Sequence, residues 1–147
     1  MIKGFDHVGI TVRNLEESVR FYCDILGFQL LNPIGDRCCD PEELACMGVE
    51  GKAGYRCVLI KTPAGLIEMF DYDHPSEGRV ADLPSNSIGK LHLAFTVENV
   101  DEEVEKLKAH GIRFYGEPRM DVLDTGKIKW VYFRDPNGIT LEFVQRF

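Results

Sequence analysis

Two stretches of this 147-residue chain repeat one another, and this repeat constrains the fold more than any other feature. The segment DHVGITV, which contains His7, is restated as LHLAFTV, which contains His92. After each segment an asparagine, Asn14 or Asn99, precedes a run of residues with apolar positions at helical spacing. A repeat of this kind indicates two similar structural units built one after the other.

Each unit is predicted to have the element order βαβββ. An asparagine suits the cap of a first helical turn, and Gly27 and Gly111 are placed to end the two helices. A segment at 36–52 reads as irregular or as a short helix. Turn signals and alternation place the strands near 4–12, 28–34, 54–62 and 65–72 around a helix at 14–26, and near 90–97, 112–115, 127–134 and 138–146 around a helix at 99–110.

The predicted fold class is α+β, with two tandem βαβββ modules forming a curved mixed sheet around a metal-binding cavity. A chain of this length, 44% hydrophobic, is expected to be a single domain over residues 1–147. The modules are placed at 1–72 and 90–147. The segment 73–89, with several Pro, Gly, Ser and Asn residues, is predicted to link them.

Composition narrows the class of partner. Asp and Glu number 24 against 17 Lys and Arg, a formal charge of −7, which argues against nucleic acid or an anionic membrane. No apolar segment approaches the length needed to span a bilayer. Five cysteines, with no Cys-x-x-Cys spacing, disfavour a disulfide framework and a zinc knuckle. We therefore expect a cytoplasmic protein with free thiols that acts on a small molecule.

Strand alternation predicts where the histidines project. Successive side chains of a strand face opposite sides of the sheet, so His7 shares a face with Gly9 and Thr11, away from the apolar residues that meet the helix. His92 repeats this arrangement. Glu68 and Glu142 interrupt apolar strands, where a carboxylate is costly to bury unless it is paired or bound to a metal.

Two imidazoles and two carboxylates suit a divalent ion such as zinc, nickel, cobalt, manganese or iron(II). The predicted ligands are His7, Glu68, His92 and Glu142. An octahedral ion with these four ligands keeps two positions for water or for substrate oxygens.

The chain resembles the vicinal oxygen chelate superfamily over essentially its whole length. This superfamily includes glyoxalase I, methylmalonyl-CoA epimerase, extradiol dioxygenases, fosfomycin resistance enzymes and bleomycin-binding proteins. The motifs that carry the resemblance are DHVGITV from Asp6, FYCDILGF from Phe21, HLAFTV from His92 and FRDPNGITLE from Phe133. The resemblance implies paired βαβββ modules that curl around a metal ion.

Within that family the ligand pattern is similar to those of bacterial glyoxalase I and of the epimerases. Dioxygenases of the family use His, His and Glu, whereas here Glu68 fills the fourth position. The resemblance implies that Glu142 and Glu68 both bind the metal and move a proton next to a metal-bound carbonyl. Thr11 and Tyr72 stand where glyoxalase I usually has an Arg and an Asn that contact glutathione, so a different substrate is expected.

Three functional classes remain open on the sequence alone. The first is a divalent-metal-dependent lyase or isomerase, glyoxalase-like or epimerase-like, acting on a small substrate. The second is an iron(II)-dependent dioxygenase, and the third is a metal-free small-molecule binding or resistance protein. A homodimer is expected, with the segment 34–54 as a lid. Surface charges are the favoured interpretation of the basic residues near the expected site, with anion binding as the alternative, for Arg37, Lys52, Arg56, Lys127 and Lys129.

Overall fold

The structure is a computed structural model that describes residues 1–49, 53–75 and 83–147. It divides into two compact units, Met1–Gly78 and Arg79–Phe147. Residues 76–82 of the predicted linker, and residues 50–52, which include Lys52, lie outside the described residues. Among the described residues no helix is long and apolar enough to cross a membrane.

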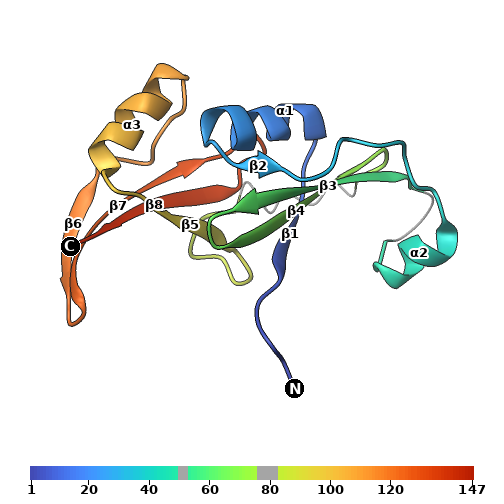
Figure 1. Ribbon diagram of the computed structural model, residues 1–147, viewed down its shortest axis with the longest axis horizontal. Coiled ribbons are helices and arrows are strands. Elements are labelled where there is room, and N and C mark those ends of the chain that lie inside the picture. The colour runs from blue at the N-terminus through green and yellow to red at the C-terminus, as the bar shows by residue number, and fades with distance from the viewer. Residues whose placement is uncertain (50–52, 76–82) are drawn as a thin grey trace. The chain divides into compact units, whose positions relative to one another are not determined.

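The first unit is a four-stranded mixed sheet with the strand order β1-β4-β3-β2 (Figure 1). Strand β1 runs parallel to β4, and the other neighbours are antiparallel. The helix α1 contacts β3 and β4. The elements are β1 (His7–Thr11), α1 (Leu15–Val19), η1 (Arg20–Ile25), β2 (Gln29–Leu30), α2 (Pro41–Cys46), β3 (Tyr55–Thr62) and β4 (Gly65–Tyr72).

The second unit repeats this topology with the strand order β5-β8-β7-β6, drawn from yellow to red in Figure 1. Strand β5 runs parallel to β8, and the remaining pairs are antiparallel. The helix α3 contacts β7 and β8. The elements are β5 (His92–Thr96), α3 (Val100–Ala109), β6 (Arg119–Leu123), β7 (Gly126–Arg134) and β8 (Thr140–Arg146). The predicted α+β class and the two tandem modules are therefore confirmed, as two open four-stranded sheets rather than one.

Each sheet packs one face against its own helix. In the first unit the buried side chains of the sheet alternate along the strands, as at Val58 and Ile60 on β3 and at Ile67 and Met69 on β4. In the second unit the buried side chains also alternate along the strands, for example Val131 and Phe133 on β7. The helix α3 contributes buried apolar residues to the same core. Burying these apolar side chains supplies the driving force that holds helix to sheet.

The two predicted helix starts have the expected caps. The side chain of Asn14 accepts a hydrogen bond from the Glu17 amide, 2.7 Å away. Asn99 accepts from two amides of α3, and its own amide group donates to Glu102 at 2.7 Å. Gly27 and Gly111 adopt φ values of +77° and +78°, conformations that L side chains rarely adopt, so both glycines end their helices as predicted.

Two strand predictions were wrong, and the first helix has the predicted extent but changes type along its length. The first helix continues as a π-helix over η1, with the Leu26 amide donating to the Phe21 carbonyl. Strand β2 has two residues rather than seven. In the second unit the segment 112–115 forms only an isolated bridge between Phe114 and Phe133, and the fourth strand is β6, further along the chain.

Candidate metal centre

The first module brings together His7 and Glu68. The Nε2 atom of His7 lies 3.2 Å from Oε2 of Glu68. The two side chains are partly exposed, at 39% for the histidine and 25% for the glutamate. The Nε2 lone pair is available to a metal ion when the imidazole is neutral and carries its proton on Nδ1.

The second module brings together His92 and Glu142 in the same way. The Nε2 atom of His92 lies 3.1 Å from Oε2 of Glu142. The glutamate side chain is only 11% exposed, and among the described residues the single ion-pair partner of its carboxylate is His92. A carboxylate removed from water to this extent needs a cation or hydrogen-bond donors, and here His92 and the Tyr132 hydroxyl are its partners.

The strand register explains why the two pairs match. Glu68 is the partner of Gly9, two residues after His7, and Glu142 is the partner of Ala94, two residues after His92. Partners in neighbouring strands project to the same face of a sheet. Each histidine therefore lies on the same sheet face as its glutamate, displaced along the neighbouring strand by two residues. This is the face opposite the helix. We call this face the histidine face in each module.

Asp6 and Cys57 complete the surroundings of the first pair. A carboxylate oxygen of Asp6 lies 2.8 Å from Nδ1 of His7, and this hydrogen bond raises the pKa of His7. A carboxylate on Nδ1 fixes the tautomer that leaves Nε2 free for a metal ion, an arrangement common around metal-binding histidines. The Cys57 thiol donates to Oε1 of Glu68 across 3.6 Å. Burial, followed by the charge of Glu68, raises the pKa of Cys57 to about 11.

Two aromatic side chains flank the second pair. The ring of Tyr132 meets the ring of His92 edge-on, with 5.2 Å between centroids, and Trp130 packs against Tyr132. Burial, and then the neighbouring Glu142 carboxylate, raise the pKa of Tyr132. Aromatic residues in a late strand are usually expected in the core, but of Trp130, Tyr132 and Phe133 only Phe133 is fully buried. Trp130 and Tyr132 alternate with the core residues and lie on the histidine face.

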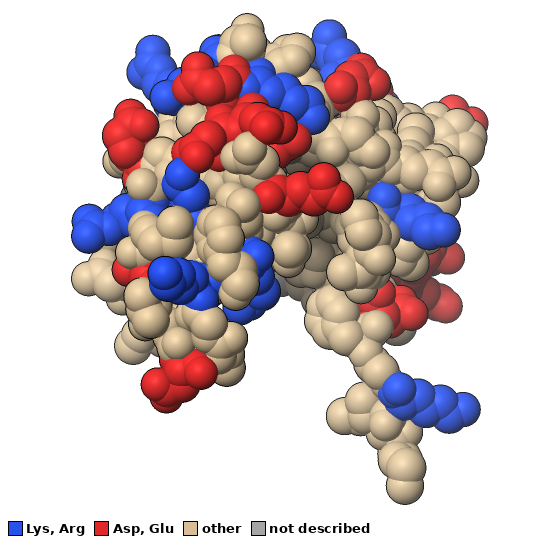
Figure 2. Space-filling view, turned by 60° about the vertical axis from the view of Figure 1, so that its left-hand side comes forward, with Lys and Arg blue, Asp and Glu red and all other residues tan. Residues whose placement is uncertain are grey.

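Three of the five basic residues considered for anion binding pair with carboxylates of the chain. Arg37 and Arg56 both pair with the buried carboxylate of Asp71, and Arg56 also pairs with Glu16. Lys129 pairs with Asp101. On the face drawn in Figure 2, acidic and basic side chains are interspersed. Arg37, Arg56 and Lys129 therefore hold the fold together, and they are not free for a ligand.

The predicted metal ligands thus form one histidine–glutamate pair per module. Among residues 1–49, 53–75 and 83–147, no three His, Cys, Asp or Glu side chains form a group that could hold a metal ion. Each pair supplies one neutral nitrogen and one anionic oxygen, a donor set that suits a divalent transition metal. Sequence analysis did not identify Asp6, Tyr132 or Cys57 as neighbours of these pairs, although Asp6 precedes the first histidine directly.

Sequence comparison decides the family. Residues 4–143 match the Glyoxalase/Bleomycin resistance protein/Dioxygenase superfamily. The chain belongs to this superfamily. A 2-epi-5-epi-valiolone epimerase from an Actinomyces species is 32% identical over 144 residues, which cover 94% of this chain and 76% of the epimerase. A probable lactoylglutathione lyase from a Synechocystis species is 28% identical, over 95% of this chain and 92% of the lyase.

The fold of the superfamily is also found in solved structures. A glyoxalase family protein from Bacillus cereus superposes with a TM-score of 0.83, at 24% identity, over 100% of this chain and 96% of that protein. This likeness concerns the fold alone. It agrees with the two tandem modules described above.

Proposed function

We propose that His7, Glu68, His92 and Glu142 bind one divalent metal ion and that the chain is a metal-dependent lyase or epimerase. The observation that supports this proposal is the equivalent placing of the two pairs. Both modules hold a histidine Nε2 and a glutamate oxygen 3.1–3.2 Å apart, at the same register, on the face opposite the helix. Each pair supplies one nitrogen and one anionic oxygen, so the two pairs together provide the four protein ligands that the proposed ion requires.

The proposed reaction moves a proton on the carbon next to the carbonyl of a small substrate. A bound divalent ion polarises such a carbonyl and makes the adjacent C–H group more acidic. The carboxylates of Glu142 and Glu68 are the groups that accept the proton and return it. If one glutamate removes the proton and the other delivers it to the opposite side, the carbon is inverted. If the proton is delivered instead to the carbon that carried the carbonyl oxygen, the carbonyl group moves to the adjacent carbon and the product is a structural isomer.

Several features of this chain support that role for the glutamates. Glu142 is buried, so its carboxylate is held in place by the surrounding protein with little access to water. The Cys57 thiol hydrogen-bonds one oxygen of Glu68 and limits the rotation of that carboxylate. Superfamily membership, with relatives named as an epimerase and a probable lyase, supports glyoxalase-like or epimerase-like activity.

Deuterium exchange detects the proposed proton transfer whichever product forms. The purified protein, supplied with each candidate metal in turn, is incubated in D2O with three probes: the hemithioacetal of methylglyoxal and glutathione, an epimerisable acyl-CoA, and 2-epi-5-epi-valiolone. We expect NMR to detect deuterium at the carbon next to a carbonyl in one of them. We expect Glu142→Gln to abolish the exchange and Glu98→Gln, an exposed glutamate of the same module, to retain it.

Two other outcomes would contradict the proposal. Oxygen consumption with a catechol and iron(II), retained in Glu68→Ala, would assign the chain to the dioxygenases. Tight binding of a probe with no exchange and no metal would assign it to the binding and resistance proteins.

A further inference from the structure

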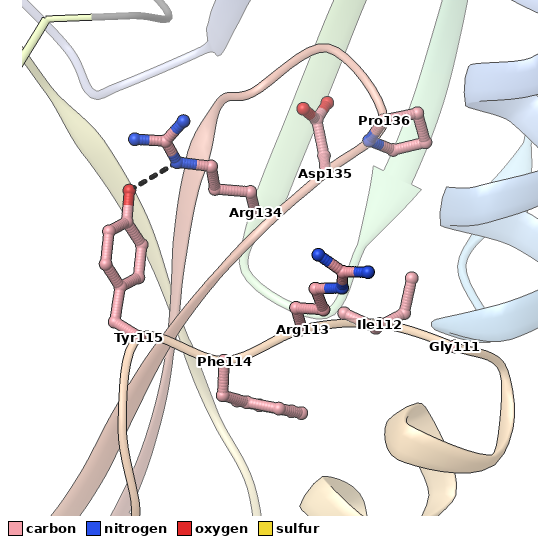
Figure 3. A pocket seen from close by; sticks show the side chains of 8 residues that line it. All are labelled: Gly111, Ile112, Arg113, Phe114, Tyr115, Arg134, Asp135 and Pro136. Carbon is pink, nitrogen blue, oxygen red and sulfur yellow. Dashed lines mark hydrogen bonds between the residues drawn. The ribbon is translucent and has the colours of Figure 1, made fainter.

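A hollow of about 350 Å³ lies at one end of the second sheet, beside the turn between β7 and β8 (Figure 3). It is lined on one side by the loop after α3 and on the other by the end of β7. Its polar and aromatic lining comes from Arg113, Phe114, Tyr115 and Arg134, together with one carboxylate, that of the buried Asp135. All of them belong to the second module, so the hollow does not depend on the first.

The strand register connects this hollow with the proposed metal ligands. Arg134 is the partner of Thr140 in β8, and Thr140 is the partner of His92 in β5. The three residues therefore form one row across the histidine face of the second module. With neighbouring strands about 4.8 Å apart, the Cα atoms of Arg134 and His92 are roughly 10 Å apart, two strands from one another.

The hydroxyl of Tyr115 contacts two members of this row, Arg134 and Thr140. The Nε atom of Arg134 donates to the Tyr115 hydroxyl at 2.5 Å, as the dashed line in Figure 3 shows. The same hydroxyl lies 3.5 Å from Oγ1 of Thr140. Burial raises the pKa of Tyr115, but its hydrogen bonds with Thr140 and Arg134 and the arginine charge outweigh it, and the pKa lies below its ordinary value. Since Arg134 donates to this oxygen, the hydroxyl proton is available either to Thr140 or to a ligand.

The charge of Arg134 is not neutralised within the part of the chain that the structure describes. Neither Arg134 nor Arg113 has a carboxylate within ion-pair distance there, and both side chains are exposed. Arg37 and Arg56, by contrast, both pair with the buried carboxylate of Asp71. A guanidinium whose Nε is already occupied keeps two terminal NH2 groups, which match the oxygens of a carboxylate or phosphate.

We propose that Arg134 and the Tyr115 hydroxyl bind an anionic group of the substrate, a carboxylate or a phosphate, while its carbonyl is held at the His92–Glu142 pair. This inference rests on the proposed function and adds a substrate class to it. Arg113 at the rim of the hollow attracts the anion to the site. The substrate is then a small anion whose charged group and reacting carbon are separated by a few bonds, in keeping with the spacing of the row.

Anion binding is measured directly, without turnover. The full-length protein, in its purified metal state, is titrated with inorganic phosphate and separately with malonate, and the backbone amides are followed by NMR. We expect saturable shifts at Tyr115, Arg134 and Thr140. We expect binding at least about tenfold weaker in Arg134→Gln, since a charge-assisted bidentate contact is lost, with a smaller loss in Arg134→Lys. Arg20→Gln, which removes an exposed arginine of the first module, serves as the matched control.

The outcomes separate this inference from the proposed function. Tighter binding of phosphate than of malonate assigns a phosphorylated substrate, and the reverse order assigns a carboxylate. Shifts that are absent, or equal in wild type and Arg134→Gln, overturn the inference. The metal content of Arg134→Gln is measured in parallel and is expected to equal that of wild type. A chain that binds the anion through Arg134 but holds no metal would contradict the proposed function alone.

Discussion

Nδ1 of His7 lies 2.8 Å from a carboxylate oxygen of Asp6, its neighbour in the chain. This contact raises the pKa of His7, since the negative charge favours the protonated ring. The raised pKa means that protons compete with a metal ion for this imidazole up to a higher pH than for an isolated histidine. Metal binding through His7 is therefore expected to weaken as the pH falls through that raised pKa.

We expect Asp6→Asn to lower the pKa of His7 toward the ordinary value of about 6.5. The measurement is an NMR titration of the His7 ring protons in chelator-treated protein. The metal affinity of Asp6→Asn is expected to fall by about tenfold or more, because the carboxylate also orients the ring. Asp24→Asn, a change at an exposed aspartate of the same module, is the control. An unchanged His7 titration in Asp6→Asn would show that the hydrogen bond does not set this pKa.

Asp71 is expected to be the most costly carboxylate to remove from the first module. Its side chain is 4% exposed and pairs with both Arg56 and Arg37. Asp71→Asn leaves two arginines without their buried partner, and we expect a loss of about 3 kcal/mol in the free energy of unfolding. Urea denaturation measures this loss. Glu16→Gln removes the exposed partner of the same Arg56 and is expected to cost less than about 1 kcal/mol. Equal losses of unfolding free energy in the two variants would contradict the claim that the buried Asp71 contributes more than the exposed Glu16.

The Asp71 carboxylate also makes the free energy of unfolding depend on pH in the acidic range. Burial alone raises the pKa of Asp71, but the hydrogen bond from Arg56 and the charges of Arg37 and Arg56 outweigh it, and the pKa lies below its usual range. The stabilisation is therefore complete above the unfolded value of about 3.9 and is lost as the pH falls through the lower folded pKa. In Asp71→Asn the unfolding free energy should decline less steeply over that acidic range.

The thiol of Cys57 is expected to react slowly with alkylating agents. Burial and the nearby Glu68 raise its pKa to about 11, so the reactive thiolate is scarce at neutral pH. The exposed Cys39 and Cys46 provide internal controls. Limited treatment with iodoacetamide, followed by peptide mass spectrometry, should label those two cysteines well before Cys57. Equal labelling of all three at pH 7 would show that Cys57 is not shielded.

The repeat and the strand alternation allowed much of this fold to be predicted from sequence. Asn14 and Asn99 cap their helices as predicted, and the alternation placed His7 and His92 on the face away from the helix. These features are local, because a cap and a two-residue period depend on a few neighbouring residues. The parallel pairing of β1 with β4 and of β5 with β8, which brings each histidine to its glutamate, was not predicted.

The missed features depend on contacts distant in sequence. Strand β2 is short because the Asn32 side chain takes over hydrogen bonds to β3, accepting from the Leu59 amide and donating to the Cys57 carbonyl. Strand β6 is exposed throughout and carries no buried face to set an alternating pattern. The pairing of Arg37 and Arg56 with Asp71 joins residues up to 34 positions apart, and local sequence contains no signal for it.

Metal content is the most direct measurement of the central claim. Wild type, Glu68→Ala, Glu142→Ala and the control Glu98→Ala are purified without an affinity tag, and elemental mass spectrometry determines the metal bound per chain. We expect one divalent ion per chain in wild type and in Glu98→Ala, and its loss in the other two variants. Folded wild-type protein without metal, even after reconstitution, or full metal content in Glu68→Ala, would contradict the four-ligand site.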